Sequence, residues 1–307
     1  MLLCRAHAFS VRQLQYLVAV AELGGFRKAA DACGVSQPSL SAQVAQVEAV
    51  LGVQVFERSP KGVRVTAAGS VVAARARQVL VAMQDLREAA RQQGDPLKGT
   101  LRVGVIPTVC PYLLPDVAPA LKKALPDLHL HWREDKTDAL MRQIAEGRID
   151  AAILALDERV AELAHVAIGD DPFVLAAAPG HPLLKDKRAA SPAVLDGATV
   201  LLLEDGHCFR DQAMALCTRS GAHEAGLRAT GLSTLVQMVV AGAGVTLLPR
   251  LAVSVENRRG QLAVRAFKSP APTRTLVLAC RKGSALRRPL EAVAAVLRSA
   301  WPAASSG

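Results

Sequence analysis

Phe26-Arg-Lys-Ala-Ala-Asp-Ala-Cys-Gly-Val-Ser-Gln-Pro-Ser-Leu-Ser-Ala-Gln-Val44 is the stretch that decides the fold of the N-terminal part of the chain. A helix from Phe26 to Ala32 should end at Gly34, because glycine tolerates the left-handed conformation that closes a helix. Ser36 then offers an N-cap, and Pro38 is tolerated in the first turn of the next helix. The stretch therefore predicts a helix-turn-helix.

The sequence on either side extends this unit. Val11 to Leu23 carries apolar residues at the 3-4 spacing of one buried helix face, and Gly24-Gly25 stops it. Two short apolar runs around Arg58-Ser-Pro-Lys-Gly62 outline a small hairpin or wing. The residues expected to face inward from the third helix are Leu40, Val44, Val47 and Leu51.

A long segment from Thr66 to about Gln93 has no internal proline and carries apolar residues along one face. A helix of this length beside a small DNA-binding unit is typical of a linker and dimer seam. Gly94-Asp-Pro96 ends it. We expect a winged helix-turn-helix domain over 1–66 and a linker helix over 67–95.

After Thr100 the pattern changes to apolar strands that alternate with helical stretches, which is typical of βαβ units and mostly parallel sheets. The fold class expected for 96–307 is α/β, with two Rossmann-like lobes arranged as in periplasmic binding proteins. The crossovers are expected near residues 170 and 270. Lobe I then covers about 96–170 and 270–307, and lobe II about 171–269. The expected strands are 101–106, 128–132, 151–156, 173–178, 199–203, 245–248, 262–267 and 276–280, and the expected helices are 111–125, 137–146, 210–217, 232–241 and 286–301.

The composition limits the class of protein. The 307 residues carry 37 Lys and Arg against 27 Asp and Glu, a formal charge of +10 that favours a polyanionic partner. No apolar run reaches the roughly 20 residues that span a bilayer, and the N-terminus lacks a signal-peptide pattern. The expected location is the cytoplasm, without membrane contact. Six cysteines with no regular framework suggest reduced thiols, so a disulfide would be regulatory.

Cys208 and Cys217 lie nine positions apart, in Glu204-Asp-Gly-His-Cys-Phe-Arg-Asp-Gln-Ala-Met-Ala-Leu-Cys217. If residues 209–217 form one helix, a rise of about 1.5 Å per residue separates the two Cα atoms by roughly 13 Å. A disulfide tolerates at most about 7 Å. Bonding the two thiols would require the helix to unwind, which would couple a chemical event to a structural change.

The N-terminal stretch, with Leu51-Gly-Val-Gln-Val-Phe-Glu-Arg58 and Thr66-Ala-Ala-Gly69, resembles the winged helix-turn-helix of LysR-type transcriptional regulators. Short polar groups suit base edges or phosphates in the major groove, and basic side chains suit phosphates. The alternative is an ordinary solvated helix face. The DNA-binding residues expected are Arg27, Lys28, Ser36, Gln37, Pro38, Ser39, Ser41, Gln43, Arg58, Lys61 and Arg64.

The rest of the chain resembles the OxyR-type peroxide sensors of the same group. The segments that carry this likeness are Ile106-Pro-Thr-Val-Cys-Pro-Tyr-Leu-Leu-Pro115, Leu202-Leu-Glu-Asp-Gly-His-Cys-Phe-Arg-Asp-Gln-Ala-Met214, Arg228-Ala-Thr230 and Gly244-Val-Thr-Leu-Leu-Pro249. The resemblance implies that Cys208 is the peroxidatic thiol and Cys217 the resolving thiol. It also implies a hydrogen peroxide-binding site beside Cys208, in which Thr108 and Thr137 bind and orient peroxide and His207, Asp211 and Arg228 form the surrounding network.

The residues fit these roles on their own chemistry. A helix beginning near Phe209 would place its unpaired N–H groups and its dipole beside Cys208, with His207 and Arg210 as neighbouring partners. Glu204 and Asp205 act in the opposite sense. Each of three residues also has a purely structural alternative: Cys217 as a small core residue, Thr108 as a turn or capping residue, and Asp211 as a first-turn residue of its own helix.

The function expected is a peroxide-sensing regulator of oxidative-stress genes, not an enzyme, with no cofactor and no metal site. His129 and His131 share a strand face but lack a completing ligand, and Cys110 is expected to be a packed residue. The resemblance implies homodimers, homotetramers and contact with promoter DNA and RNA polymerase, with reduction by cellular thiols. The alternatives are a regulator that senses a metabolite between the lobes and a peroxide-consuming thiol enzyme.

Overall fold

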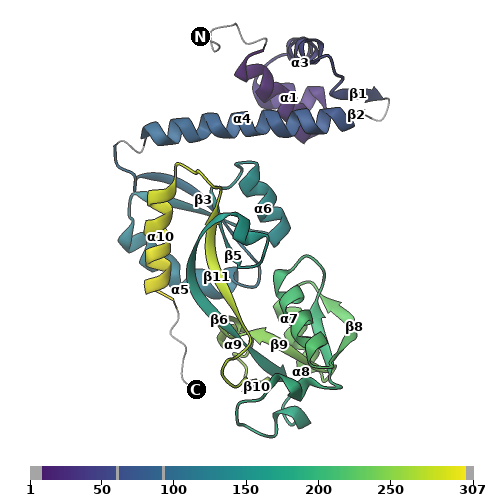
Figure 1. Ribbon diagram of the computed structural model, residues 1–307, viewed down its shortest axis with the longest axis vertical. Coiled ribbons are helices and arrows are strands. Elements are labelled where there is room, and N and C mark those ends of the chain that lie inside the picture. Colours follow the sequence, from purple (N-terminus) through teal and green to yellow (C-terminus); the bar gives the residue numbers. More distant parts are fainter. Residues whose placement is uncertain (1–8, 60–61, 92–93, 302–307) are drawn as a thin grey trace. The chain divides into compact units, whose positions relative to one another are not determined.

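The computed structural model describes residues 9–59, 62–91 and 94–301, and the chain divides into two compact units at Arg91 (Figure 1). The elements of the first unit are α1 (Val11–Leu23), α2 (Phe26–Cys33), α3 (Gln37–Leu51), β1 (Phe56–Ser59), β2 (Gly62–Val65) and α4 (Ala67–Arg91). This order confirms the winged helix-turn-helix followed by one long helix.

Local capping signals place the turn between α2 and α3 as the sequence predicts. Gly34 closes α2 with a φ of 66°, and the hydroxyl of Ser36 accepts a hydrogen bond from the Ser39 N–H at 3.4 Å. Leu40, Val44 and Val47 are fully buried, as expected. Leu51 is 38% exposed, so its inward assignment was wrong. It is the last residue of α3 and extends past the core that the earlier turns cover.

The wing pairs β1 with β2 antiparallel, with Phe56 opposite Val65. Its first strand begins later than the apolar run at residue 53 suggests. The carboxylate of Glu48 accepts the backbone N–H groups of Val55 and Phe56 at 2.7 and 3.0 Å, so this segment bonds to α3 before it reaches the partner strand. The end of α3 and the start of the wing are thereby fixed together.

Helix α4 starts against the wing. A Cβ at Gly69 would lie 2.1 Å from the carbonyl oxygen of Val55, so only glycine fits there. Ala73 and Ala76 are buried in the core of the first unit, and α1 packs on the same helix. Val79 and Leu86 are 46% and 65% exposed, so the apolar face continues beyond the part that this core covers.

The second unit is built from two α/β lobes. The strands are β3 (Gly99–Val105), β4 (Leu128–Glu134), β5 (Ala151–Ala155), β6 (Ala164–Ala177), β7 (Thr199–Leu203), β8 (His223–Ala229), β9 (Val245–Pro249), β10 (Ala263–Ala266) and β11 (Thr273–Cys280). The helices are α5 (Cys110–Ala124), α6 (Thr137–Ala145), α7 (Cys208–Arg219), α8 (Leu232–Val240), α9 (Arg250–Glu256) and α10 (Arg287–Ser299), with 3-10 turns η1 (Val160–Glu162), η2 (Pro182–Leu184) and η3 (Pro192–Leu195).

The strand order β4-β3-β5-β11-β6-β9-β7-β8 runs through both lobes, and β10 pairs with β6. The strands β3 to β5 and β7 to β9 pair in parallel within their lobes, as predicted. The crossover strands β6 and β11 are antiparallel to their neighbours, so the whole sheet is mixed. Strand β6 is 14 residues long and passes from one lobe into the other, whereas the sequence indicated a strand only over 173–178.

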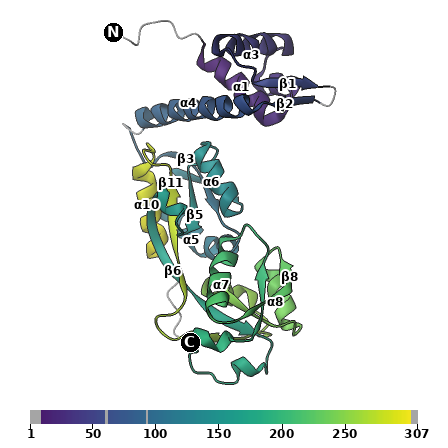
Figure 2. The same cartoon turned by 45° about the vertical axis from the view of Figure 1, so that its right-hand side comes forward.

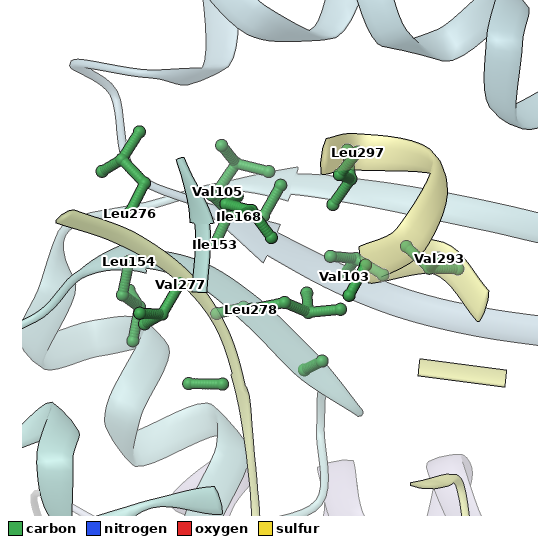
Figure 3. Close-up of a cluster of buried hydrophobic side chains, with 14 of the residues drawn as sticks. Val103, Val105, Ile153, Leu154, Ile168, Leu276, Val277, Leu278, Val293 and Leu297 are labelled. Carbon is green, nitrogen blue, oxygen red and sulfur yellow. The ribbon is translucent and has the colours of Figure 1, made fainter. Parts of the chain in front are cut away.

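Each lobe has its own apolar core. In lobe I, helices α10 and α6 lie on opposite sides of the strands (Figures 1 and 2). Figure 3 shows Val293 and Leu297 of α10 beside Val103, Val105 and Ile168 of the strands. The lobe II core is formed by β6, β7 and β9 with α7, α8 and α9.

Two side chains cross between the lobes. Tyr112 of α5 packs in the lobe II core and donates a hydrogen bond to Glu256 at 2.6 Å, while Cys208 of α7 packs in the lobe I core. The starts of α5 and α7 are therefore held at the junction of the two cores. Within the described residues, no helix is both long and apolar enough to cross a membrane.

Candidate functional site

The helix-turn-helix presents its expected DNA-contacting residues on the surface. Arg27 and Lys28 on α2 are exposed. The exposed residues at the start of α3 are Ser36, Gln37, Pro38 and Ser39, and Ser41 and Gln43 are half-buried. This is the N-terminal end of the second helix of the motif, the part that reaches base edges in helix-turn-helix proteins.

The wing carries the remaining basic residues of the expected set. Arg64 is exposed on β2 and forms an ion pair with Glu57 at 2.9 Å. The backbone of Arg58 belongs to β1. Lys61 lies outside the described residues.

Cys208 is the first residue of α7, with His207 as the N-cap. The helix therefore begins one residue earlier than the sequence suggests. The thiol is 5% exposed and contacts the lobe I core. Its backbone N–H is one of the groups at a helix start that have no partner within the helix.

Cys217 lies in the last turns of the same helix, with Phe209 and Ala213 on its face, and all three are buried in the lobe II core. Burial, together with the smaller effect of the nearby Glu224 carboxylate, raises the pKa of the Cys217 thiol to about 11. Both thiols are free. An intact helix holds their Cα atoms roughly 13 Å apart, so they cannot bond in this conformation.

Thr108 is fixed by a fully buried arginine. The guanidinium of Arg274 donates to the Thr108 hydroxyl at 2.8 Å and to its carbonyl at 2.9 Å. It also forms a salt bridge with Asp171 at 2.8 Å, in which both side chains are 0% exposed. The paired, hydrogen-bonded arrangement is what makes a buried charge tolerable.

Arg274 also reaches α7, because its guanidinium lies 5.6 Å from the ring centroid of Phe209, the residue after Cys208. The sequence reasoning missed this residue. Arg274 stands opposite Asp171 in the register of β11 and β6, at a buried position of an apolar strand. A charged residue at a buried position of an apolar strand is the sequence signal that could have identified Arg274.

Thr137 and His207 each bring a buried polar atom without a hydrogen-bond partner among the described residues. These atoms are Thr137 Oγ1 and His207 Nε2. Burial lowers the pKa of His207, and the positive charge of Lys136 lowers it further. The Thr230 backbone bonds to the same ring. Both unpartnered atoms lie at helix starts, His207 at the cap of α7 and Thr137 in the first turn of α6.

Arg210 and Arg228 share two carboxylates at the outer side of α7. Arg210 donates to Asp205 at 2.8 Å and to Glu224 at 2.8 and 3.1 Å, and Arg228 donates to the same carboxylates at 3.0 Å. Both guanidinium groups are thus engaged in this cluster. Asp211 is exposed in the first turn of α7.

Cys110 is the first residue of α5 and is half-buried. Burial raises the pKa of its thiol to about 12, helped by a hydrogen bond to the carboxylate of Glu134. Cys280, half-buried at the end of β11, also has a pKa raised by burial. Raised values keep a thiol protonated and unreactive. Within the described residues, no group of three or more His, Cys, Asp or Glu side chains is arranged to hold a metal ion.

The two units match two family models. Residues 11–70 match the bacterial regulatory helix-turn-helix protein, lysR family, and residues 94–302 match the LysR substrate binding domain. A hydrogen peroxide-inducible genes activator from Dickeya chrysanthemi is 44% identical over 290 residues, which cover 94% of this chain and 95% of that protein.

Solved structures agree with this match. A full-length OxyR variant from Pseudomonas aeruginosa aligns with a TM-score of 0.79 and 34% identity over 95% of each chain. An OxyR variant from Corynebacterium glutamicum, described as H2O2-bound, aligns with a TM-score of 0.65 and 34% identity over 96% of this chain and 94% of that one. The chain belongs to the LysR-type transcriptional regulators. Within that family it is of the OxyR type.

Proposed function

We propose that this chain senses hydrogen peroxide through Cys208 and reports it to promoter DNA through a disulfide with Cys217. The Cys208 thiolate attacks one peroxide oxygen, the O–O bond breaks, and the departing hydroxide takes a proton to become water. Cys208 becomes a sulfenic acid. The Cys217 thiol then displaces its hydroxyl as a second water and forms the S–S bond. Two electrons pass from the two thiols to one peroxide.

The first step is supported by the surroundings of Cys208. The start of α7 offers unpaired N–H groups and a favourable dipole, which stabilise a thiolate. In the part of the chain that the structure describes, Thr137 Oγ1 and His207 Nε2 are buried and have no hydrogen-bond partner, which suits a small molecule that both donates and accepts hydrogen bonds. Thr108, fixed by Arg274, presents a further hydroxyl. These three residues are the proposed peroxide-binding groups.

Asp211 and Arg228 have more distant roles in this proposal. Asp211 is exposed on α7, and Arg228 is tied to Asp205 and Glu224. They shape the segment before and after Cys208 and do not need to contact peroxide. The relative from Dickeya chrysanthemi is named for hydrogen peroxide induction, and the Corynebacterium glutamicum neighbour is described as H2O2-bound.

The second step requires α7 to unwind. Its two thiols lie in different cores, and burial keeps Cys217 protonated until the segment rearranges. Closing so short a loop constrains the chain by roughly 3 kcal/mol in the loop-entropy model. Strain in the rearranged segment, which is separate from this entropy effect, favours reduction by cellular thiols and would reset the switch.

We assign DNA binding and dimer formation to the first unit, which includes α4. The exposed polar start of α3 and the basic residues of α2 and the wing are proposed to contact DNA. Exposed Val79 and Leu86 make the apolar face of α4 a candidate dimer seam. We further propose tetramers through the effector lobes, contact with RNA polymerase and a cytoplasmic location. Residues 1–66, 67–95 and 96–307 are the proposed functional domains.

The test is peptide mapping without reductant after a brief peroxide pulse, combined with promoter output. The wild type should yield one Cys208–Cys217 crosslinked peptide and induced transcription, and Cys217→Ser should lose both. Cys280→Ser is the matched control, because this thiol also has a raised pKa. If Cys217→Ser kept full induction, the two-cysteine switch would be wrong.

A further inference from the structure

Lys136 links lobe I to the loop that precedes Cys208. It is the N-cap of α6, and its Nζ lies 2.5 Å from Glu204 Oε1. The same ammonium group donates to the Asp205 carbonyl at 3.2 Å. Lys136 belongs to lobe I and Glu204 follows strand β7 of lobe II, so the ion pair joins the two lobes.

This link lies beside Thr137 Oγ1 and His207 Nε2, two of the buried atoms that have no hydrogen-bond partner among the described residues. Thr137 follows Lys136 directly in the chain, and His207 is three residues after Glu204. The aliphatic stem of Lys136 lies over Gly206, where an added Cβ would stand 3.3 Å from Lys136 Cδ. The Lys136 stem therefore packs against Gly206, the loop residue that precedes His207 and Cys208.

The ion pair is poorly suited to a purely stabilising role. The side chains of Lys136 and Glu204 are 37% and 38% exposed, and ion pairs with such exposure contribute little to folding. Thr137, which follows Lys136 in the chain, and His207, three residues after Glu204, are only 2% and 4% exposed. The pair is thus partly exposed and adjacent in the chain to two buried polar residues, so it matters more for the geometry it fixes than for the stability it adds.

We propose that Lys136 is a positioning residue for the peroxide reaction. Its ion pair with Glu204 holds the starts of α6 and α7 at the spacing that lets Thr137 and His207 engage one peroxide molecule. Its stem closes the site against larger hydroperoxides. This inference rests on the proposed function and adds to it the element that sets the size of the accepted peroxide.

Two single substitutions separate positioning from simple electrostatics. Lys136→Met removes a positive charge and Glu204→Gln removes a negative one, so a field effect on the Cys208 thiolate would change the rate in opposite directions. Loss of the ion pair between the lobes would instead lower the rate of Cys208 oxidation in both variants. A double variant, Lys136→Glu with Glu204→Lys, restores an ion pair of reversed polarity and should restore the geometry.

The experiment uses the reduced full-length protein and rapid-mixing measurement of Cys208 oxidation by hydrogen peroxide and by cumene hydroperoxide. Both single variants should react with hydrogen peroxide about tenfold more slowly, because small misplacements of reacting groups are costly. Their preference for hydrogen peroxide over cumene hydroperoxide should narrow. The double variant should recover most of the rate and the preference.

Arg159→Gln is the matched control, since it breaks an ion pair with Asp138 of the same helix start, at 2.7 Å, within lobe I. It should leave both rates unchanged. Wild-type rates and preference in both single variants, or rates that move in opposite directions, would overturn the positioning role alone. If Cys208 of the wild type failed to react with hydrogen peroxide, the proposed function would fall as well.

Discussion

Cys208 and Cys217 occupy the same helix, α7, but are buried in different cores, Cys208 in lobe I and Cys217 in lobe II. A bond between them must remove one thiol from its core and break helical hydrogen bonds. The reduced conformation is thus incompatible with the product of the proposed reaction. This conflict is what would turn oxidation of a thiol into a change of protein structure.

Breaking the buried pair Arg274–Asp171 should strongly destabilise the second unit. Asp171→Asn leaves the guanidinium without its counter-charge, and breaking a buried pair typically costs about 3–5 kcal/mol. Urea unfolding of the reduced protein measures this cost. Arg188→Gln, which breaks the exposed pair with Asp186, should leave the free energy of unfolding nearly unchanged. Equal effects of the two substitutions would contradict the account.

Thr108→Val should separate the two tasks of this threonine. It removes one acceptor from buried Arg274, which costs about 1–3 kcal/mol of unfolding free energy. It should also slow oxidation of Cys208 by peroxide, because the hydroxyl is one of the proposed peroxide-binding groups. Thr108→Ser keeps the hydroxyl and should restore the rate. Slow oxidation of Cys208 in the Thr108→Ser variant would show that the Thr108 hydroxyl does not determine the rate of the peroxide reaction.

The raised pKa of Cys217 predicts a pH dependence of stability. The unfolded thiol loses its proton near its ordinary pKa of 9.0, while the folded one holds it to about 11. The stabilising contribution is therefore full below pH 9 and is lost as the pH rises through about 11. Under reducing conditions, the free energy of unfolding should fall more steeply over this interval in the wild type than in Cys217→Ala. Parallel curves would refute the assignment.

Gly69→Ala should damage the first unit and spare the second. The new Cβ would meet the Val55 carbonyl oxygen at 2.1 Å, so the contact between α4 and the wing has to open. DNA affinity in a gel-shift assay should fall sharply, while Cys208 should still react with peroxide. Ala68→Ser, at the exposed neighbouring position, is the control. Wild-type DNA affinity in Gly69→Ala would contradict this packing.

Arg27→Ala should weaken binding to all DNA sequences to a similar degree and reduce the salt dependence of binding by about one ion, as expected for one lost phosphate contact. Gln37→Ala should instead reduce the preference for the operator over unrelated DNA. Arg75, whose side chain bonds to Gln78 on α4, supplies the control substitution Arg75→Ala. A salt dependence unchanged in Arg27→Ala would remove this residue from the contact set.

The sequence predicted best the features that neighbouring residues determine. Gly34 and Ser36 place the turn of the first unit, and the apolar run 199–203 coincides with β7. Strand β8 was missed because His223 to Ala229 is mostly polar or exposed and lacks an apolar alternation. Side chains that act through distant partners were also missed, because strand register brings Arg274 to Asp171 and the meeting of two lobes brings Lys136 to Glu204.

The most direct test of the central claim is hydrogen–deuterium exchange of the backbone amides of residues 208–219 before and after oxidation. We expect slow exchange along α7 in the reduced protein, a large acceleration after a peroxide pulse, and recovery on reduction. Cys217→Ser should keep its protection after the same pulse, because it cannot form the bond. A wild-type protein that forms the Cys208–Cys217 disulfide while α7 keeps its protection would contradict the claim.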